Sequence, residues 1–231
     1  MRLAACAAAL LLVPLLAACG GGSASPAAED TGASPAGSPI SPAGGTTCDY
    51  PAATQGATRR VNPPPSTPDV HGTVPVTMRT SIGTLQATLD ADKTPCTVSS
   101  FVSLARQGFF NKTPCHRLTT EVIYVLQCGD PTGTGTGGPG YTIPDELTGQ
   151  ETYGAGTLAM ANIGQPNTGG SQFFIVYRNT RLPPTYTVFG QVSSASVQAV
   201  RDVARQGTDN AYGHGDGHPK VPVTLQQVTV G

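Results

Sequence analysis

The sequence predicts a mainly β fold, a closed antiparallel barrel capped by two α-helices. Many short apolar runs are separated by turns, and the chain contains 29 Gly and 21 Pro, which favour turns and loops over long helices. Only two stretches have the apolar spacing of an amphipathic helix. Many strands with few helices are typical of a closed antiparallel barrel.

The first residues have the pattern of a targeting segment. Arg2 precedes an apolar stretch over 3–16, which is too short to span a bilayer comfortably. Leu16-Ala17-Ala18-Cys19 follows, so 1–18 resembles a bacterial lipoprotein signal peptide with Cys19 as the lipidated residue. Acyl chains such as palmitate on Cys19 would hold the protein on the extracytoplasmic face of the cell membrane. The alternative is a plain secretory signal with an incidental cysteine.

The next segments lead to one folded domain. Residues 19–47 consist mostly of Gly, Ser, Pro, Ala and Thr without periodicity, which predicts a disordered linker. Residues 48–73 are rich in proline and predict an extended arm, and Cys48 and Tyr50 indicate that part of it rests on the domain. Residues 74–231 are long enough for one sizeable core.

Four cysteines follow the signal segment, and an exported chain favours disulfides among them. Three pairings are open; we favour Cys96–Cys115 with Cys48–Cys128. A metal site is a weaker interpretation because the spacings are wide and no CxxC motif occurs. The net charge of −1 provides no basic face for nucleic acid.

The domain opens with a hairpin and a helix. Residues 74–79 and 84–89 alternate in polarity around Ser81-Ile82-Gly83, as the two strands of a hairpin do. Thr94 can cap a helix, Pro95 suits its first position and Gly108 its end. Its apolar face is spaced i, i+3, i+4, i+7 and consists of Val98, Phe101, Val102 and Ala105.

Further strands and a second helix complete the domain. The helix spans about 195–206, presents Val197, Val200, Val203 and Ala204, and ends at Gly207. Phe173 and Phe174 are neighbours on one predicted strand and must point to opposite faces, so one belongs to the core and the other to a second surface. The remaining strand-like runs are 115–119, 122–128, 156–161, 172–177, 187–192 and 221–229.

Several motifs of familiar chemistry are incomplete. The glycine-rich segment 133–140 lacks the Gly-Lys-Ser/Thr ending of a P-loop, so it predicts a surface loop whose glycines allow close approach of a peptide. The segment 214–218, His-Gly-Asp-Gly-His, could bind a metal, but a solvated turn is the default. No Gly-x-Ser-x-Gly elbow is present.

A set of motifs in one order resembles the cyclophilin family of peptidyl-prolyl cis-trans isomerases across about 74–230. The resemblance implies a closed eight-stranded antiparallel barrel capped by two helices, in an exported, actinobacterial-type member. The motifs are Phe101, His116-Arg117, Gln127-Cys128-Gly129-Asp130, Gly135-Thr136-Gly137-Gly138, Leu158-Ala159-Met160-Ala161-Asn162, residues 167–175 (Asn-Thr-Gly-Gly-Ser-Gln-Phe-Phe-Ile) and Val188-Phe189-Gly190-Gln191-Val192.

The resemblance also assigns site residues. It implies that Arg117, Gln127 and Asn162 are catalytic. It implies that the substrate-binding residues are His116, Tyr124, Val125, Gly135, Ala161, Ile163, Gln172, Phe174, Leu182 and Tyr186. The expected partners are proline-containing polypeptides, with no cofactor, no metal and no nucleic acid, and the expected state is a monomer.

These residue types suit rotation about an amide bond. The barrier of roughly 18–20 kcal/mol is lost resonance, and no covalent bond is broken. In the twisted state the prolyl nitrogen regains a lone pair, which Arg117 would stabilise more than the planar ground state. Gln127 could hold the guanidinium, the Asn162 N–H could hold the carbonyl, and an apolar pocket could hold the proline ring.

The sequence departs from the family pattern in four places. The corner over 119–122 is two residues longer, and the loop after Asn162 gains a residue near Gln165. Arg181 stands where many members have a groove tryptophan, which argues against tight cyclosporin binding, and Tyr186 replaces a groove histidine. The alternative function is a module that binds proline-containing segments, or a chaperone, with little turnover.

Overall fold

The computed structural model describes residues 45–231. The predicted signal peptide 1–18, the lipidated Cys19 and all but the last three residues of the 19–47 linker lie outside the described residues. Within the described part of the chain, no helix is both long enough and apolar enough to span a membrane.

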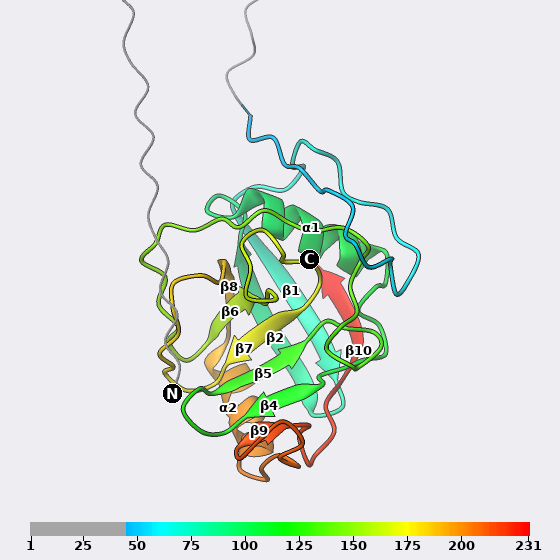
Figure 1. Cartoon of the computed structure of the whole chain (residues 1–231). Helices are drawn as coiled ribbons and strands as arrows, with labels where there is room; N and C mark the ends of the chain where they lie inside the picture. The colour runs from blue at the N-terminus through cyan, green and yellow to red at the C-terminus, as the bar shows by residue number, and fades with distance from the viewer. Residues whose placement is uncertain (1–44) are drawn as a thin grey trace, which may run out of the picture. The chain divides into compact units, whose positions relative to one another are not determined.

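The domain is built on one antiparallel sheet of ten strands, in the order β3-β10-β1-β2-β8-β6-β7-β5-β4-β9 (Figure 1). Every predicted strand run overlaps one of them. The strands are β1 (Thr73–Thr80), β2 (Gly83–Asp90), β3 (Thr113–Pro114), β4 (Arg117–Thr119), β5 (Val125–Cys128), β6 (Thr157–Met160), β7 (Phe173–Val176), β8 (Val188–Val192), β9 (Asp216–Gly217) and β10 (Thr224–Val230).

The sheet is curled, and a short connection in the chain links its two ends. β3 lies at one end of the strand order and β4 next to the other end, yet only Cys115 and His116 separate them. No strand pairing among the described residues joins β3 to β4 or β9. The architecture is therefore a curled, mainly β sheet, and the closed ladder of eight strands that we expected is not confirmed.

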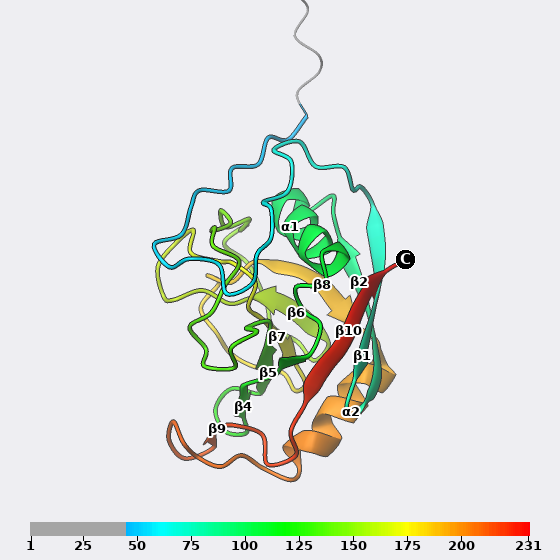
Figure 2. The same ribbon diagram turned by 90° about the vertical axis from the view of Figure 1, so that its right-hand side faces the viewer.

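Two helices lie at opposite ends of the sheet (Figure 2). α1 (Pro95–Arg106) packs on β10 and β2, and α2 (Ser194–Ala204) packs on β2. The four predicted apolar positions of α1 are buried, as are Val197, Val200 and Val203 of α2. Pro95 and Gly108 stand where the sequence predicted, at the first helical position and just after the end.

The predicted cap of α1 is wrong in its chemistry. Thr94 occupies the cap position, but its hydroxyl donates to the Asp90 carbonyl and caps nothing. The first amides of α1 are instead bound by the Glu146 carboxylate, which accepts from Cys96 N at 2.9 Å and from Thr97 N at 2.8 Å. A negative charge at this end also suits the helix dipole. The cap comes from a loop fifty residues away in the chain.

The four cysteines form two disulfides, as expected, but the favoured pairing is wrong: the bonds are Cys48–Cys96 and Cys115–Cys128. The arm passes over the start of α1, where Tyr50 also donates to the Cys96 carbonyl, so Cys48 meets that helix. Cys115 precedes β4 and Cys128 ends β5, and these strands pair through Arg117 opposite Gln127. That register brings the second pair of cysteines together.

The arm rests on the glycine-rich segment as well as on α1. Ala53 N donates to the Gly140 carbonyl at 2.9 Å, and Thr58 N donates to the Gly138 carbonyl at 3.0 Å. Arg59 donates to the Phe109 carbonyl at 2.7 Å. The arm thereby supports the loop over 133–140 from the side away from the sheet.

Candidate functional site

One row of residues crosses four strands and organises the candidate site. Arg117 on β4 lies opposite Gln127 on β5, Gln127 opposite Phe174 on β7, and Phe174 opposite Ala159 on β6. Directly opposed residues on neighbouring antiparallel strands point to the same face. Strands are about 4.8 Å apart, so the backbones of Arg117 and Phe174 are roughly 10 Å apart, within reach of a long arginine side chain.

An apolar cluster forms around one end of this row. Phe174 packs edge-on against Tyr186, with ring centroids 5.4 Å apart. Phe173 belongs to the main core instead, so the predicted split of the two phenylalanines is confirmed. The buried members of the apolar cluster are Val125, Tyr153, Ala159, Phe174 and Val176, with Ala161, Leu182, Tyr186 and Val188 packed against them.

Tyr153 is a member of this cluster that the sequence did not single out. Its hydroxyl has two carbonyl acceptors for its one hydrogen, Pro183 at 3.1 Å and Tyr186 at 3.2 Å, and it accepts from Tyr186 N at 3.1 Å. Burial raises the pKa of the phenol, so it remains a neutral donor. Tyr153 thereby holds the segment that presents Leu182 and Tyr186.

A line of polar side chains runs along the other part of the row. Gln127 Nε2 donates to Gln172 Oε1 at 2.9 Å. Gln172 Nε2 donates to the carbonyls of Gly135 and Gly137 at 2.9 and 3.0 Å. Arg117 NH1 reaches Gln127 Oε1 only at 3.5 Å, the limit of a hydrogen bond. The two glutamines therefore connect the arginine side of the site to the glycine-rich segment.

Asp216 holds Arg117 much more closely than Gln127 does. Its carboxylate accepts from Arg117 Nε at 2.8 Å and from NH2 at 2.6 Å, a bidentate pair. The hydrogen bond from Arg117 to this carboxylate raises the pKa of the guanidinium, which stays charged. The sequence did not identify Asp216 as a partner of Arg117, because 99 residues separate the two and the 214–218 segment was predicted to be a turn.

Asp130 organises the glycine-rich segment from within. Its buried carboxylate accepts from the amides of Thr132, Gly135 and Gly137 at 2.8, 2.8 and 3.0 Å. Burial opposes its ionisation, but these bonds and the Thr132 hydroxyl outweigh burial and lower the pKa of Asp130. The carbonyls of Gly135 and Gly137 are thereby turned toward Gln172.

His116 lies beneath this segment and is buried. Its ring would be 3.4 Å from a Cβ added at Gly135. Burial lowers the pKa of the imidazole, and Nδ1 has no hydrogen-bond partner within residues 45–231. His116 supports Gly135 from below, and a direct contact with substrate stays a prediction.

Asn162 lies beside the apolar cluster, just after β6. Its side chain donates from Nδ2 to the Thr185 carbonyl at 2.9 Å and accepts from Gly164 N at 3.0 Å. Its own backbone N–H donates to no atom of the described chain. Ala161 before it is half-buried, and Ile163 after it is 81% exposed. A backbone donor is therefore available next to an apolar surface.

Tyr124 lies apart from the other predicted site residues. Its ring packs against Tyr177 and under the guanidinium of Arg178, 4.6 Å from the ring centroid. It contacts the main core and is not a member of the apolar cluster. Alternation along the strand sends it to the face opposite Val125.

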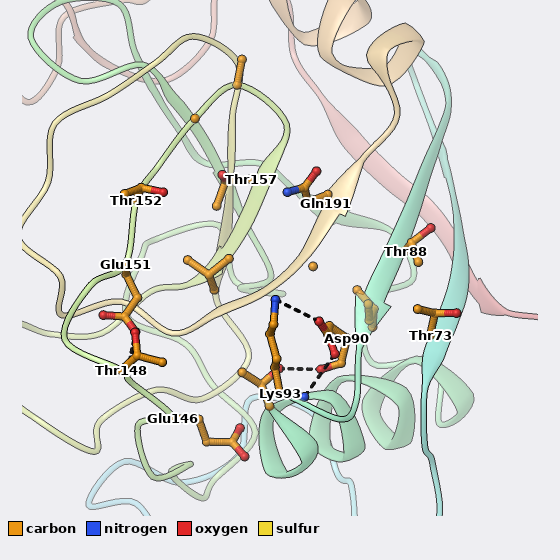
Figure 3. A pocket seen from close by; sticks show the side chains of 16 residues that line it. Thr73, Thr88, Asp90, Lys93, Glu146, Thr148, Glu151, Thr152, Thr157 and Gln191 are labelled. Atoms are coloured by element: carbon orange, nitrogen blue, oxygen red, sulfur yellow. Dashed lines mark hydrogen bonds and ion pairs between the residues drawn. The ribbon is translucent and has the colours of Figure 1, made fainter.

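A separate hollow of about 690 Å³ lies between β2, β8, the start of α1 and the loop over 146–155 (Figure 3). None of the predicted site residues lines it. Its charged groups have partners in the protein: Lys93 pairs with Asp90 at 3.5 Å, Glu146 caps α1, and Glu151 accepts from Thr148 and Gly149. The chemistry of this hollow therefore identifies no ligand.

The histidines of the 214–218 segment have carboxylate partners. His214 Nδ1 lies 2.9 Å from Glu121 Oε2, and His218 Nδ1 lies 2.8 Å from Asp209 Oδ2. Among residues 45–231, no three His, Cys, Asp or Glu side chains are grouped in a way that could hold a metal ion.

Comparison with known proteins agrees with this geometry. The family model for the cyclophilin type peptidyl-prolyl cis-trans isomerase/CLD matches residues 75–230. The chain is 43% identical over 199 residues to a probable peptidyl-prolyl cis-trans isomerase B of Mycobacterium leprae and 45% identical to one of Mycobacterium tuberculosis. These matches cover 80% of this chain but only 66% and 64% of the two relatives.

A solved structure shares the fold. The crystal structure of a cyclophilin type peptidyl-prolyl cis-trans isomerase of Cryptosporidium parvum superimposes with a TM-score of 0.60 at 27% identity. The match covers 69% of this chain and 98% of that one. A second crystal structure of that protein, in the presence of the dipeptide Ala-Pro, matches with a TM-score of 0.58. The family match over most of the folded domain shows that this chain belongs to the cyclophilin-type peptidyl-prolyl cis-trans isomerases.

Proposed function

We propose that the protein is a peptidyl-prolyl cis-trans isomerase that accelerates rotation about X-Pro bonds. The observation that supports this most is the row from Arg117 through Gln127 to Phe174, which sets a fixed guanidinium beside an apolar cluster. Uncatalysed X-Pro exchange takes tens to hundreds of seconds, so acceleration matters for folding.

The chemistry needs a cation and an apolar surface together. The ring of proline packs on Phe174, Leu182 and Val125, which exclude water. When the amide twists, the prolyl nitrogen loses resonance and regains a lone pair. An N–H of Arg117 then donates to that nitrogen, a bond that the planar ground state cannot accept as well. Binding is stronger in the transition state, which lowers the barrier.

The remaining groups hold the substrate still. The free backbone N–H of Asn162 donates to the carbonyl of the residue before proline. Gln127 and Gln172 fix the polar side of the groove, and Gly135 forms part of its edge. The Ala-Pro dipeptide present with the Cryptosporidium relative supports proline-containing peptides as the substrate class.

A proline-isomerisation assay on wild type and Arg117→Ala tests the proposal. We expect at least a tenfold loss of kcat/KM, about 1.4 kcal/mol in the barrier. Arg79→Ala is the matched control, because Arg79 is an exposed arginine on β1. Equal rates in wild type and Arg117→Ala would exclude this mechanism. Peptide binding without turnover in the wild type would instead support a module that binds proline-containing segments.

Export and lipid anchoring belong to the same proposal. Two disulfides in one small domain favour an oxidising compartment, which supports export. The proposed anchor is Cys19, at the end of the signal pattern. Cys19→Ala should release the protein from the membrane fraction, whereas the matched Cys6→Ala should not. Retention of Cys19→Ala in the membrane would contradict the anchor.

Weak binding of cyclosporin is a further expectation. Arg181, which is exposed, stands where many family members have a groove tryptophan. A charged side chain offers less apolar contact than an indole. Inhibition of the wild type by cyclosporin should therefore be weak, and replacement by tryptophan, Arg181→Trp, should strengthen it; an unchanged inhibition curve would contradict this role.

A further inference from the structure

We infer that Asp216 is a positioning residue for the isomerase reaction, which orients the guanidinium of Arg117 in the groove. The inference rests on the proposed function and deepens it. It assigns a role to a carboxylate in the 214–218 segment, which the sequence predicts to be a solvated turn.

The geometry of the pair follows from strand pairing. β9 pairs with β4, and Asp216 lies opposite Thr119. Arg117 is two residues before Thr119, so Arg117 and Asp216 are diagonal neighbours on one face, within reach of long side chains. The two bonds, at 2.8 and 2.6 Å, use Nε and one terminal nitrogen. A bidentate pair fixes the plane of the guanidinium as well as its position.

The fixed plane leaves one edge for the substrate. With Nε and NH2 bound to Asp216, NH1 is the nitrogen on the side of Gln127. The contact to Gln127, at 3.5 Å, is too long to orient the guanidinium alone. Preorganisation of the donor avoids the loss of side-chain freedom at the moment of reaction, which is how positioning lowers a barrier.

The loop that carries Asp216 is itself braced. Asp216 N donates to the Gly213 carbonyl and Thr120 N donates to the Gly215 carbonyl, at 3.0 and 2.8 Å. Asp209 Oδ1 accepts from Ala211 N at 3.0 Å, and it lies 2.2 Å from where a Cβ on Gly217 would be. Only glycine fits there. The carboxylate therefore has a fixed place before any substrate arrives.

The longer corner after β4 contributes to this brace. Glu121 pairs with His214, and a Cβ added at Gly215 would lie 2.8 Å from Glu121 Cγ. Glu121 of the longer corner thus contacts the loop that holds Asp216. The longer corner and the carboxylate that binds Arg117 are therefore neighbours in the fold.

A carboxylate beside a cation has two opposite effects. It orients the guanidinium, which favours the reaction, and it weakens the positive potential at the prolyl nitrogen, which opposes it. If Asp216 acts mainly by orienting the guanidinium, its removal slows the reaction. If it acts mainly by weakening the positive potential, its removal makes the reaction faster. The sign of the effect therefore decides between them.

The experiment is a double-mutant cycle in the proline-isomerisation assay. We expect Asp216→Ala to lower kcat/KM about tenfold, mostly in kcat, because the apolar cluster and Asn162 still bind peptide. In the Arg117→Ala background, Asp216→Ala should cause no further loss, since it acts through the arginine. Asp202→Ala is the matched control, because Asp202 lies on α2, away from the site, and pairs with Arg205 just after that helix. It should match wild type.

Asp216→Asn keeps the size of the side chain and one acceptor oxygen, so it serves if the alanine variant fails to fold. We expect an intermediate rate and faster hydrogen exchange of Arg117 Nε–H by NMR. Full activity of both Asp216 variants with an inactive Arg117→Ala would overturn this inference and leave the proposed function intact. A faster enzyme would also overturn it. Equal rates in wild type and Arg117→Ala would overturn both proposals.

Discussion

The carboxylate of Asp130 occupies the space that a side chain at Gly137 would need. A Cβ added at Gly137 would lie 2.0 Å from Asp130 Oδ1, a distance that no real contact allows. The same carboxylate accepts from Gly137 N at 3.0 Å. The glycine and the aspartate together set the position of the carbonyls that bind Gln172.

Gly137→Ala should therefore damage both stability and activity. The added methyl group must displace Asp130, which breaks hydrogen bonds to a buried charge, each worth about 1.5–3 kcal/mol. We expect the free energy of unfolding in urea to fall by at least that amount, and kcat/KM to fall with it. The neighbouring Gly138→Ala is the control, because its Cβ meets nothing within 4 Å. Equal losses in both variants would contradict this account.

Acid should destabilise the fold in two separate steps. Burial lowers the pKa of His116 below 6.5; Asp130 acts against this shift, and Arg117 and His218 add to it. The unfolded chain thus takes up a proton at His116 at a higher pH than the folded chain. Its contribution to stability is complete above about pH 6.5 and declines as pH falls below that value. Asp130 has a lowered pKa, so its contribution is lost below about pH 3.8.

His116→Gln removes the first of these steps. We expect the free energy of unfolding of wild type to decrease between pH 7 and 5, and that of the variant to decrease less, with thermal or urea unfolding as the measurement. His71→Gln is the control, since His71 is exposed in the arm. If the variant and wild type show the same slope, His116 is not the group responsible.

The two disulfides should stabilise the domain by different amounts. Cys48–Cys96 closes a loop of 48 residues and Cys115–Cys128 one of 13. Loop-closure entropy gives about 4 kcal/mol for the first and about 3 kcal/mol for the second. Paired Cys→Ser variants of each bond, unfolded in urea without reductant, measure the difference. Non-reducing peptide mapping checks the pairing, and recovery of a Cys96–Cys115 peptide would refute it.

The helices and most strands could be predicted because their signals are local. The apolar spacing of 98–105 and the alternation of 74–89 depend on neighbours a few residues apart, and the observed elements follow them. Phe173 and Phe174 separate for the same reason, since alternation along one strand decides their faces. The resemblance to the family then identifies Arg117, Gln127 and Phe174 as site residues, and the strand register places them in one row.

The remaining features depend on contacts between distant segments. Cys48 could have met any of three partners, and the path of the arm over α1 decides for Cys96. Glu146 caps α1 and Asp216 holds Arg117 from loops whose positions no periodicity encodes. Short two-residue strands such as β9 have no pattern of their own, so the partner of the arginine could not be found from sequence.

Val122 in the longer corner has a strained backbone, and relief of that strain is measurable. Its φ is +62°, its side chain is 86% exposed, and Ile123 N donates to the Glu121 carbonyl at 2.6 Å, which makes a three-residue turn. A positive φ costs a β-branched residue of the order of 1–3 kcal/mol, and asparagine tolerates it far better. Val122→Asn should therefore raise the free energy of unfolding by about 1 kcal/mol. Val221→Asn, at another exposed valine, should not raise it. A fall in stability for Val122→Asn would mean that the valine makes contacts worth more than the strain.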